Sequence, residues 1–394
     1  MKIVFDRKML CNTFPPLMSA VSTRSTTPAT EGVLIEANDD GSCVLTTYDT
    51  EKGMRLSIEA KVYSAGSCII NAQKLLQIMR VMDGDELELT VDEKMSAKIS
   101  CGRSTHRMSA TPAKDFPSLP DIVRDRGFVI PCAMLKKMLN QTNHAMGNDD
   151  TRVILNGTFV HVNAEQLTLV SCDSFKLAKC VKNIQLENKS APDREFNYKF
   201  IIPVKTINEL MKLLSDEDEM ATVFCTRKYI IFIIDGITFF SRLIDGEYID
   251  YNRIIIKDHK IKAVMNREEL ISALERAALV TEERIAHAVR SHVKLEFAGD
   301  TLKISASSAN GSTYDEIHIE HEGPDLIIAF NNRYLIDSVR ACTGENVILS
   351  LSSPLTSINI EPVNNCDESE QNDESDCYQN SEEIFMLLPV RMKE

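Results

Sequence analysis

The residues of this chain that could perform chemistry do not form any common catalytic motif. The 394-residue sequence contains no Gly-x-x-x-x-Gly-Lys loop for phosphate, no Gly-x-Ser-x-Gly nucleophile turn and no His-Glu-x-x-His zinc motif. The nearest metal-like cluster is His318-Ile319-Glu320-His321. We expect it in a strand, where residues three apart point to opposite faces and do not ligate one metal. We therefore predict no catalytic residue, no metal site and no cofactor.

The cysteines and the apolar segments indicate a reduced, cytoplasmic protein without a membrane partner. There are 11 Cys, an odd number, and they form no Cys-x-x-Cys pair. Scattered cysteines in a large chain are typical of reduced thiols that fill the core. The start of the chain, Met1–Lys8, lacks the apolar stretch of a secretory signal, and no apolar run approaches the length of a membrane span.

The elements that could position a binding site repeat three times, with a spacing of about 130 residues, which is an ordinary domain size. The end of a strand runs into an amphipathic helix at Ile70–Met79, Ile202–Met211 and Phe330–Val339, and an alternating strand follows each copy. The predicted first helices span 6–24, 132–147 and 266–284, and the second helices span 71–82, 203–216 and 331–343. Asn266 is a plausible N-cap with Glu269 three residues on, and Pro15-Pro16 should interrupt or delay the first helix.

The fold class that this pattern predicts is α+β, with each unit reading strand, helix, strands, helix, strands and with antiparallel hairpins. Linkers are expected near 119–125 and 250–253. Residues 361–383 carry nine acidic and no basic side chains, which favours a solvated loop. The apolar segment 384–392 that follows should dock into a sheet or line a groove.

The charge is unevenly divided between helices and the remainder. The whole chain has a net charge of −14, but the six predicted helices hold 14 basic and 9 acidic residues. A basic helical layer in an acidic protein suggests a surface that faces a polyanion. The alternative is that helices collect Lys and Arg because of their helix propensity. A scaffold of repeats without DNA, and a cytosolic hydrolase or metalloenzyme, remain the rival interpretations at this point.

Several short motifs, in this order and across the whole chain, resemble the bacterial sliding clamp family, the beta subunit of DNA polymerase III. They are Gly102-Arg103-Ser104, Asp115-Phe116-Pro117, Leu155-Asn156-Gly157, Ser171–Ala178, Asp245–Tyr251 and Leu388-Pro389-Val390-Arg391. The resemblance implies three tandem clamp domains, each with two helices packed on antiparallel sheets. Their expected bounds are 1–122, 127–252 and 253–394, the last with the acidic insertion 361–383.

The resemblance also implies partners. The family forms a head-to-tail homodimer, a ring of six units that holds double-stranded DNA topologically and without sequence preference. It tethers the polymerase III alpha subunit, the clamp loader and other proteins with clamp-binding motifs, and it confers processivity without catalysis. The positions that match the family's DNA contacts are Arg24, Lys74, Asn148, Arg152 and Lys205. Gln73 stands where relatives often have a basic residue, and each matched residue taken singly could instead be an ordinary surface charge.

A peptide-binding groove between the second and third units is the second implied site. We expect an apolar pocket rimmed by Lys and Arg, suited to an extended peptide with Leu or Phe anchors. The matching positions are Arg152, Cys172, Ser174, Phe175, Lys176, Leu177, Ile249, Arg253, Ile254, Tyr334, Leu355, Met386, Leu388, Pro389, Val390 and Arg391. The family commonly has Thr-Asp-Gly-His-Arg-Leu where this chain has Cys172–Leu177, and Ile249 replaces a frequent Pro, so the pocket should be more apolar. The alternative is that Leu177, Ile254 and Leu355 are plain core.

A ring-closing interface is the third implied site. The matching positions are Arg103, His106 and Met108 on the first unit and Leu279, Val280 and Glu316 on the third. The family often has an aromatic residue in place of His106 and a richer acidic row before Glu316. Closure is therefore expected to be weaker here, with His106 as a hypothetical source of pH sensitivity.

Overall fold

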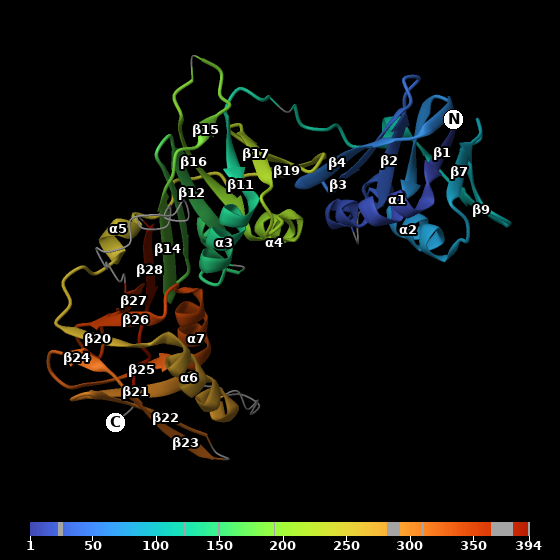
Figure 1. Cartoon of the computed structure of the whole chain (residues 1–394). Helices are drawn as coiled ribbons and strands as arrows, with labels where there is room; N and C mark the ends of the chain where they lie inside the picture. The colour runs from blue at the N-terminus through green and yellow to red at the C-terminus, as the bar shows by residue number, and fades with distance from the viewer. Residues whose placement is uncertain are drawn as a thin grey trace. The chain divides into compact units, whose positions relative to one another are not determined.

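The computed structural model describes residues 1–22, 27–121, 123–148, 150–192, 194–281, 292–308, 311–363 and 381–392. By its internal contacts the chain divides into two compact units. Unit 1 comprises Met1–Leu135, Glu187–Glu195 and Asn208–Leu243; unit 2 comprises Lys136–Leu186, Phe196–Ile207 and Ile244–Glu394. Each unit holds two antiparallel sheets (Figure 1). No helix in the described residues is long and apolar enough to cross a membrane.

Unit 1 contains a five-stranded and a ten-stranded sheet. The five-stranded sheet has the order β5 (Lys61–Ser64), β1 (Lys2–Asp6), β7 (Glu86–Val91), β8 (Ser96–Cys101), β9 (Ser104–Ser109). The ten-stranded sheet has the order β10 (Thr111–Pro112), β6 (Gly66–Asn71), β2 (Gly32–Ala37), β3 (Ser42–Tyr48), β4 (Lys52–Glu59), β19 (Ile237–Arg242), β18 (Tyr229–Ile234), β17 (Met220–Cys225), β11 (Gly127–Pro131), β15 (Glu187–Asn188). Because β4 pairs with β19, with Leu56 opposite Ile237, strands of the first and second repeats share one sheet.

Unit 2 contains a nine-stranded and a four-stranded sheet. The nine-stranded sheet has the order β16 (Asn197–Pro203), β12 (Gly157–Asn163), β13 (Gln166–Cys172), β14 (Lys176–Asn183), β28 (Ser381–Leu387), β27 (Ile358–Pro362), β26 (Asn346–Leu351), β20 (Ile261–Asn266), β24 (Glu320–Glu322). The four-stranded sheet has the order β23 (Ser312–His318), β22 (Thr301–Ser307), β21 (His292–Ala298), β25 (Leu326–Asn331). Here β14 pairs with β28, with Leu177 opposite Met386, so the second and third repeats also share a sheet.

The first predicted helix is shorter than expected. Helix α1 spans only Arg7–Thr13, and a 3₁₀ helix over Pro15–Ala20 follows it, whereas we predicted one helix over 6–24. The reason is Pro15-Pro16, since proline lacks the amide hydrogen that an α-helix interior needs and its ring crowds the preceding turn. The rest of that prediction, 23 and 24, lies outside the described residues.

The remaining five helices lie where the repeat predicts them. They are α2 (Ala72–Val81), α3 (Cys132–Asn143), α4 (Val204–Leu213), α6 (Arg267–Thr281) and α7 (Asn332–Ala341). A short helix that we did not predict, α5 (Tyr251–Ile254), lies in the expected linker near 250–253. Further 3₁₀ turns span Pro28–Glu31, Ala113–Asp115 and Val153–Leu155. In Figure 1, α1 lies beside α2, and α6 lies beside α7.

Asparagine side chains cap the starts of three helices, α2, α6 and α7. The Oδ1 atoms of Asn71, Asn266 and Asn331 accept hydrogen bonds of 3.0, 3.0 and 3.2 Å from the backbone amides three residues on. The predicted cap at Asn266 is therefore confirmed. Such caps satisfy a backbone donor that has no partner within the helix.

Replacing Asn71 by alanine is expected to destabilise the protein by about 1 kcal/mol, because the Lys74 amide loses its side-chain partner. Asn71→Asp keeps an acceptor and should behave as the wild type. Thermal unfolding of unit 1 reports the difference, and equal melting temperatures for the alanine and aspartate variants would contradict the capping role.

A buried ionic group lies at the join between the second and third repeats. Glu383 of β28 is 2% exposed and accepts hydrogen bonds from the Thr343 amide and hydroxyl at 3.0 and 2.9 Å. The Nζ of the buried Lys182, on β14, lies 3.8 Å from a Glu383 carboxylate oxygen. Because an ionised group inside a protein needs partners in fixed positions, this arrangement favours one register of β28 against β14.

The predicted strand at His318–His321 does not exist as a single strand. His318 ends β23 in the four-stranded sheet, and Glu320 begins β24 in the nine-stranded sheet. The His321 ring donates from Nδ1 to the Gly299 carbonyl oxygen, at 3.0 Å. Within the part of the chain that is described, no three His, Cys, Asp or Glu side chains are arranged to hold a metal ion.

Candidate protein-binding groove, helical layer and open sheet edges

A hydrophobic cluster of unit 2 underlies the predicted groove. Its buried members are Val170, Cys172, Leu177, Ile255 and Met386, and we call them the groove cluster. The ladder brings three of them together, because Leu177 lies opposite Cys172 on one side and opposite Met386 on the other. Partly buried residues pack against it, namely Phe159, Tyr248, Ile249, Tyr251 and Ile384. Leu177 is therefore core, as the alternative interpretation held.

Other predicted groove residues are exposed and apolar. Leu355 is 70% exposed, Phe175 55%, Leu388 41% and Ile254 39%. Ile254 and Leu355 are thus not plain core. Val153, next to Arg152, is a further exposed aliphatic side chain, 62% exposed, that we did not predict. The sequence feature that could have indicated it is an apolar residue directly after a polar segment. Exposed apolar side chains in such number favour contact with a partner.

Lys176 does not lie at the groove rim, where we expected it. It is 7% exposed, its Nζ lies 2.5 Å from Asp173 Oδ2, and it sits 4.7 Å from the centre of the Tyr334 ring. A buried ammonium needs a carboxylate partner, and an aromatic face also favours a cation. Tyr334, near the start of α7, in turn lies 6.4 Å from Phe175, ring centre to ring centre. Lys176 thus packs against the Tyr334 ring, which in turn neighbours Phe175.

Arg152 is fixed at the surface by two neighbours. Its guanidinium forms an ion pair with Asp150 at 3.1 Å and donates a 2.8 Å hydrogen bond to the Ser174 hydroxyl. The hydrogen bonds that Arg152 donates to the Asp150 carboxylate raise the pKa of Arg152 and lower the pKa of Asp150. Ser174 therefore helps to orient this arginine. Arg253 is 87% exposed and pairs with Asp250 at 2.9 Å.

The end of the chain is held by backbone hydrogen bonds. The Leu388 amide donates to the Phe175 carbonyl at 2.8 Å, and the Val390 amide donates to the Ala329 carbonyl of β25 at 2.7 Å. Pro389 and Val390 are partly exposed, and Arg391 is exposed. The tail thus presents its side chains next to Phe175 while its backbone is anchored at two points.

The thiol of Cys172 is unreactive, although the residue belongs to the groove cluster. It is 4% exposed, and its thiol donates to the Asp173 carbonyl at 3.0 Å. Burial raises the pKa of Cys172 to about 12, so the reactive thiolate is scarce near neutral pH. Burial also raises the pKa of the neighbouring Tyr248. These groups contribute apolar surface rather than reactivity.

The residues matched to DNA contacts lie on two kinds of element. Lys74 is exposed on α2 of unit 1. In unit 2, Lys205 is exposed in the first turn of α4, while Asn148 and Arg152 are exposed in the loop after α3. Arg24 lies outside the described residues. The exposed members suit contact with phosphates, which is where sequence-independent binding occurs.

The basic excess of the helices is partly neutralised by local pairs. Arg7 donates to the Gly84 and Met79 carbonyls at 2.6 and 3.2 Å, and Lys8 pairs with Asp85 at 3.4 Å. On α6, Arg276 pairs with Asp315 at 2.8 Å; Arg340 of α7 pairs with Glu275. The number of basic residues alone therefore overstates the positive charge that this layer offers to a polyanion.

Strands β9 and β23 form open edges of the two smaller sheets in the described residues. β9 ends the five-stranded sheet and β23 ends the four-stranded sheet. Arg103 and His106 are exposed at or before β9, where Met108 is partly exposed; Leu279 is 79% exposed on α6, with Val280 partly exposed. Glu316 is exposed on β23 and accepts from the hydroxyl of Tyr314, an exposed aromatic that we did not predict. Open edges invite another strand.

Comparisons with known proteins agree with this geometry. Family models for the N-terminal, central and C-terminal domains of the DNA polymerase III beta subunit match residues 1–120, 129–250 and 252–372. The beta sliding clamp of Chlamydia pneumoniae is 31% identical over 354 residues, which is 89% of this chain and 93% of that protein. That of Staphylococcus epidermidis is 28% identical over 357 residues, with 88% and 92% covered.

Solved structures are similar as well. The DNA polymerase sliding clamp of Bacillus subtilis aligns with a TM-score of 0.88 and 26% identity, and both chains are covered completely. A sliding clamp from Pseudomonas aeruginosa bound to griselimycin aligns with a TM-score of 0.85 and 25% identity, again over both whole chains.

Proposed function

Since the chain belongs to the bacterial beta sliding clamp family, the beta subunits of DNA polymerase III, we propose that two copies close head to tail into a ring around duplex DNA. The chain is a DNA sliding clamp for DNA polymerase III and not an enzyme. In this proposal the three domains are 1–122, 127–252 and 253–394, and the protein acts in the cytoplasm.

The open edges of β9 and β23 support ring closure best. Inside the chain, antiparallel pairing joins successive repeats into sheets of ten and nine strands. The leftover sheets have five and four strands, so joining β9 of one copy to β23 of another would form a third sheet of similar size. Arg103 and Arg107 near one edge complement Asp315 and Glu316 on the other. The opposite edges are less available: β5 is short, and Val390 bonds to β25.

Such a ring explains how an acidic chain holds DNA. Net charge of −14 disfavours ordinary phosphate-driven binding. Topological enclosure needs only a mildly basic lining, and the partly neutralised helices provide one. In the proposal Lys74, Asn148, Arg152 and Lys205, together with Arg24, contact the backbone weakly, so that the clamp slides.

The groove supports the tethering part of the proposal. A buried apolar floor at Leu177 and Met386, exposed Phe175 and Leu388 beside it, and the fixed cation of Arg152 suit an extended peptide with apolar anchors. We propose that the polymerase alpha subunit, the clamp loader and other proteins with clamp-binding motifs bind here.

Removing two lining cations should weaken direct contact with DNA. In the Lys74→Ala, Lys205→Ala double variant, we expect the log–log dependence of affinity for a short linear duplex on salt to become shallower, by about 0.9 for each phosphate that the variant no longer neutralises. Lys228→Ala, in a turn of the ten-stranded sheet, is the matched control. Equal salt slopes in all three proteins would argue against a lining role for these lysines.

The test of the whole proposal is topological. The protein is loaded onto nicked circular DNA by a clamp loader, and the DNA is then cut once. A ring should remain on the circle and slide off the linear product. Retention on linear DNA, or failure to associate at all, would count against the proposal.

A further inference from the structure

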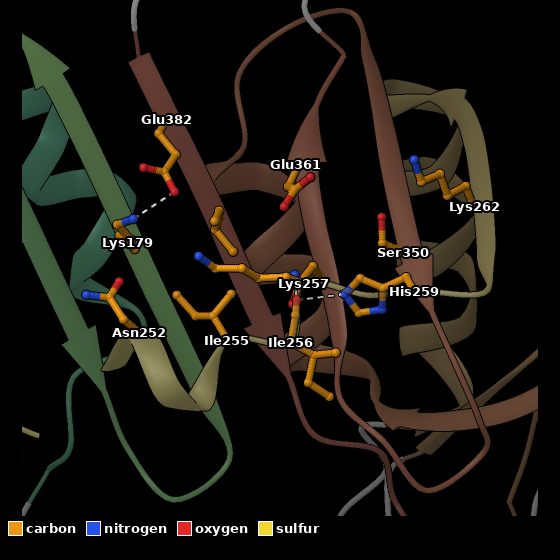
Figure 2. Close-up of a pocket in the computed structure, with 12 residues that line it drawn as sticks. Lys179, Asn252, Ile255, Ile256, Lys257, His259, Lys262, Ser350, Glu361 and Glu382 are labelled. Carbon is orange, nitrogen blue, oxygen red and sulfur yellow. Dashed lines mark hydrogen bonds and ion pairs between the residues drawn. The ribbon is translucent and has the colours of Figure 1, made fainter. Parts of the chain in front are cut away.

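A cavity beside the groove cluster has no part in the function described so far. It has a volume of about 320 Å³ and lies on the nine-stranded sheet of unit 2, where the segment from Asn252 to His259 borders it. Figure 2 shows Lys179, Glu361, Glu382 and Lys262 on the strands around it, with His259 between them. Its residues come from β14, β28, β27, β26 and β20 as well as from that segment.

The cavity and the groove share a wall. Ile255 belongs to the groove cluster, Ile384 packs against that cluster, and both line the cavity. The pairing of β14 with β28 explains this. Lys179 lies opposite Ile384, and Leu177 lies opposite Met386. Because the two pairs are two residues apart along the strands, their side chains lie on the same face of the sheet. A ligand that occupies the groove would therefore have the cavity as its immediate neighbour.

Among the described residues that line the cavity, the buried side-chain atom without a hydrogen-bond partner is an acceptor. Asn359 is 3% exposed, and its Nδ2 donates to the Ile256 carbonyl at 2.9 Å, while its Oδ1 is buried and has no hydrogen-bond partner among the described residues. Glu361 is partly buried and forms no ion pair within 4 Å in the described part of the chain. Burial, and to a lesser degree Glu382, raises the pKa of Glu361, while the charge of Lys262 acts against this shift. An unpaired buried acceptor is costly and favours a ligand that donates.

The other charged groups narrow the choice of ligand. Lys179 is already paired with Glu382 at 2.7 Å, and burial lowers the pKa of His259, whose Nε2 lies 3.0 Å from the Ile256 carbonyl. Lys257 and Lys262 are exposed at the rim, where solvent and salt screen their charge, so the buried acceptors decide which ligand fits. The shared wall of Ile255 and Ile384 suits an aliphatic stem. A guanidinium on such a stem offers several donors in one plane.

We propose that this cavity binds an arginine side chain of a partner peptide whose apolar anchors lie in the groove. The inference rests on the proposed peptide-binding function and deepens it. The arginine stem would pass Ile255 and Ile384, and the guanidinium would donate to Asn359 Oδ1 and to the Glu361 carboxylate. Partners that carry an arginine at the right distance from their anchors would then be preferred.

Fluorescence anisotropy of the full-length protein tests this with seven labelled peptides. One carries Leu and Phe anchors alone; the others add, at either end, a Gly-Gly spacer and arginine, its neutral isostere citrulline, or alanine. At one of the two ends we expect arginine to bind about 10-fold more tightly than citrulline or alanine, because a charged donor forms a stronger hydrogen bond to a buried acceptor than a neutral donor does. In Glu361→Gln the advantage of arginine over citrulline should fall to about 2-fold or less.

Glu345→Gln, an exposed residue before β26, is the matched control and should keep the full advantage. Equal affinities of arginine and citrulline peptides for the wild type would overturn the inference and leave the groove intact. An arginine advantage that survives in Glu361→Gln would overturn the assignment to this cavity. If even the unextended peptide fails to bind, the proposed groove fails, and the inference fails with it.

Discussion

A chain that ends at Leu387 is expected to form the same dimer as the full chain but to bind anchor-bearing peptides about 100-fold more weakly. The truncation removes Leu388, which lies beside Phe175, together with Pro389 and Val390. It also removes the Leu388 amide that holds the Phe175 carbonyl at 2.8 Å. Removing one central apolar side chain from an interface commonly costs about 2 kcal/mol or more, and here more than one is removed.

The experiment has a close control in the same tail. A chain that ends at Arg391 lacks only Met392, Lys393 and Glu394 and should bind the peptide as the full chain does. Peptide affinity is measured by fluorescence anisotropy, and dimer mass by sedimentation. The groove assignment would be refuted by wild-type affinity in the chain that ends at Leu387.

The repeat and its elements could be predicted well because they depend on local patterns. Strands β7 and β26 span the residues that alternate in the sequence, and the Asn266 cap follows from residue type and spacing. Proline explains the early end of α1. The short helix α5 was missed because four residues carry too little periodicity to reveal a helix.

The sequence patterns do not show which distant strands pair with each other. Alternation shows that β4 and β28 have a buried face but not which strand bonds to their edges. The structure pairs β4 with β19 and β14 with β28, and in this way three sequence repeats fold into two compact units. The three domains expected at 1–122, 127–252 and 253–394 therefore remain a proposal, because the internal contacts divide the chain into two units.

The site was predicted in outline, but the charges in it were not. Lys176 was expected at a rim, yet Asp173 and Tyr334 hold it in the interior. Arg7 was counted among the basic residues of the helical layer, yet its guanidinium donates hydrogen bonds to the carbonyl oxygens of Gly84 and Met79. The number of charged residues cannot show such partners, because they come from segments that are far apart in the sequence. The unpartnered Oδ1 of Asn359 was equally invisible in the sequence.

Replacing Leu279 by glutamate is expected to dissociate the ring into monomers. Leu279 is 79% exposed on α6, next to the open β23 edge in the proposed interface. A carboxylate buried there would lack a partner, because Asp315 and Glu316 already match Arg103 and Arg107 in the proposal. The cost of an unpaired buried charge should raise the dimer dissociation constant at least about 100-fold. Sedimentation should then give the mass of the 44.2 kDa chain rather than twice that mass.

Ile327→Glu is the matched control for this prediction. Ile327 is also exposed and aliphatic, but it lies on β25, at the opposite edge of the same four-stranded sheet. That variant should remain dimeric and should still be retained on nicked circular DNA, whereas Leu279→Glu should lose retention while its groove binds peptide normally. This separation follows because the hold on DNA depends on closure, and the groove lies within one chain. A dimeric Leu279→Glu protein would place ring closure elsewhere.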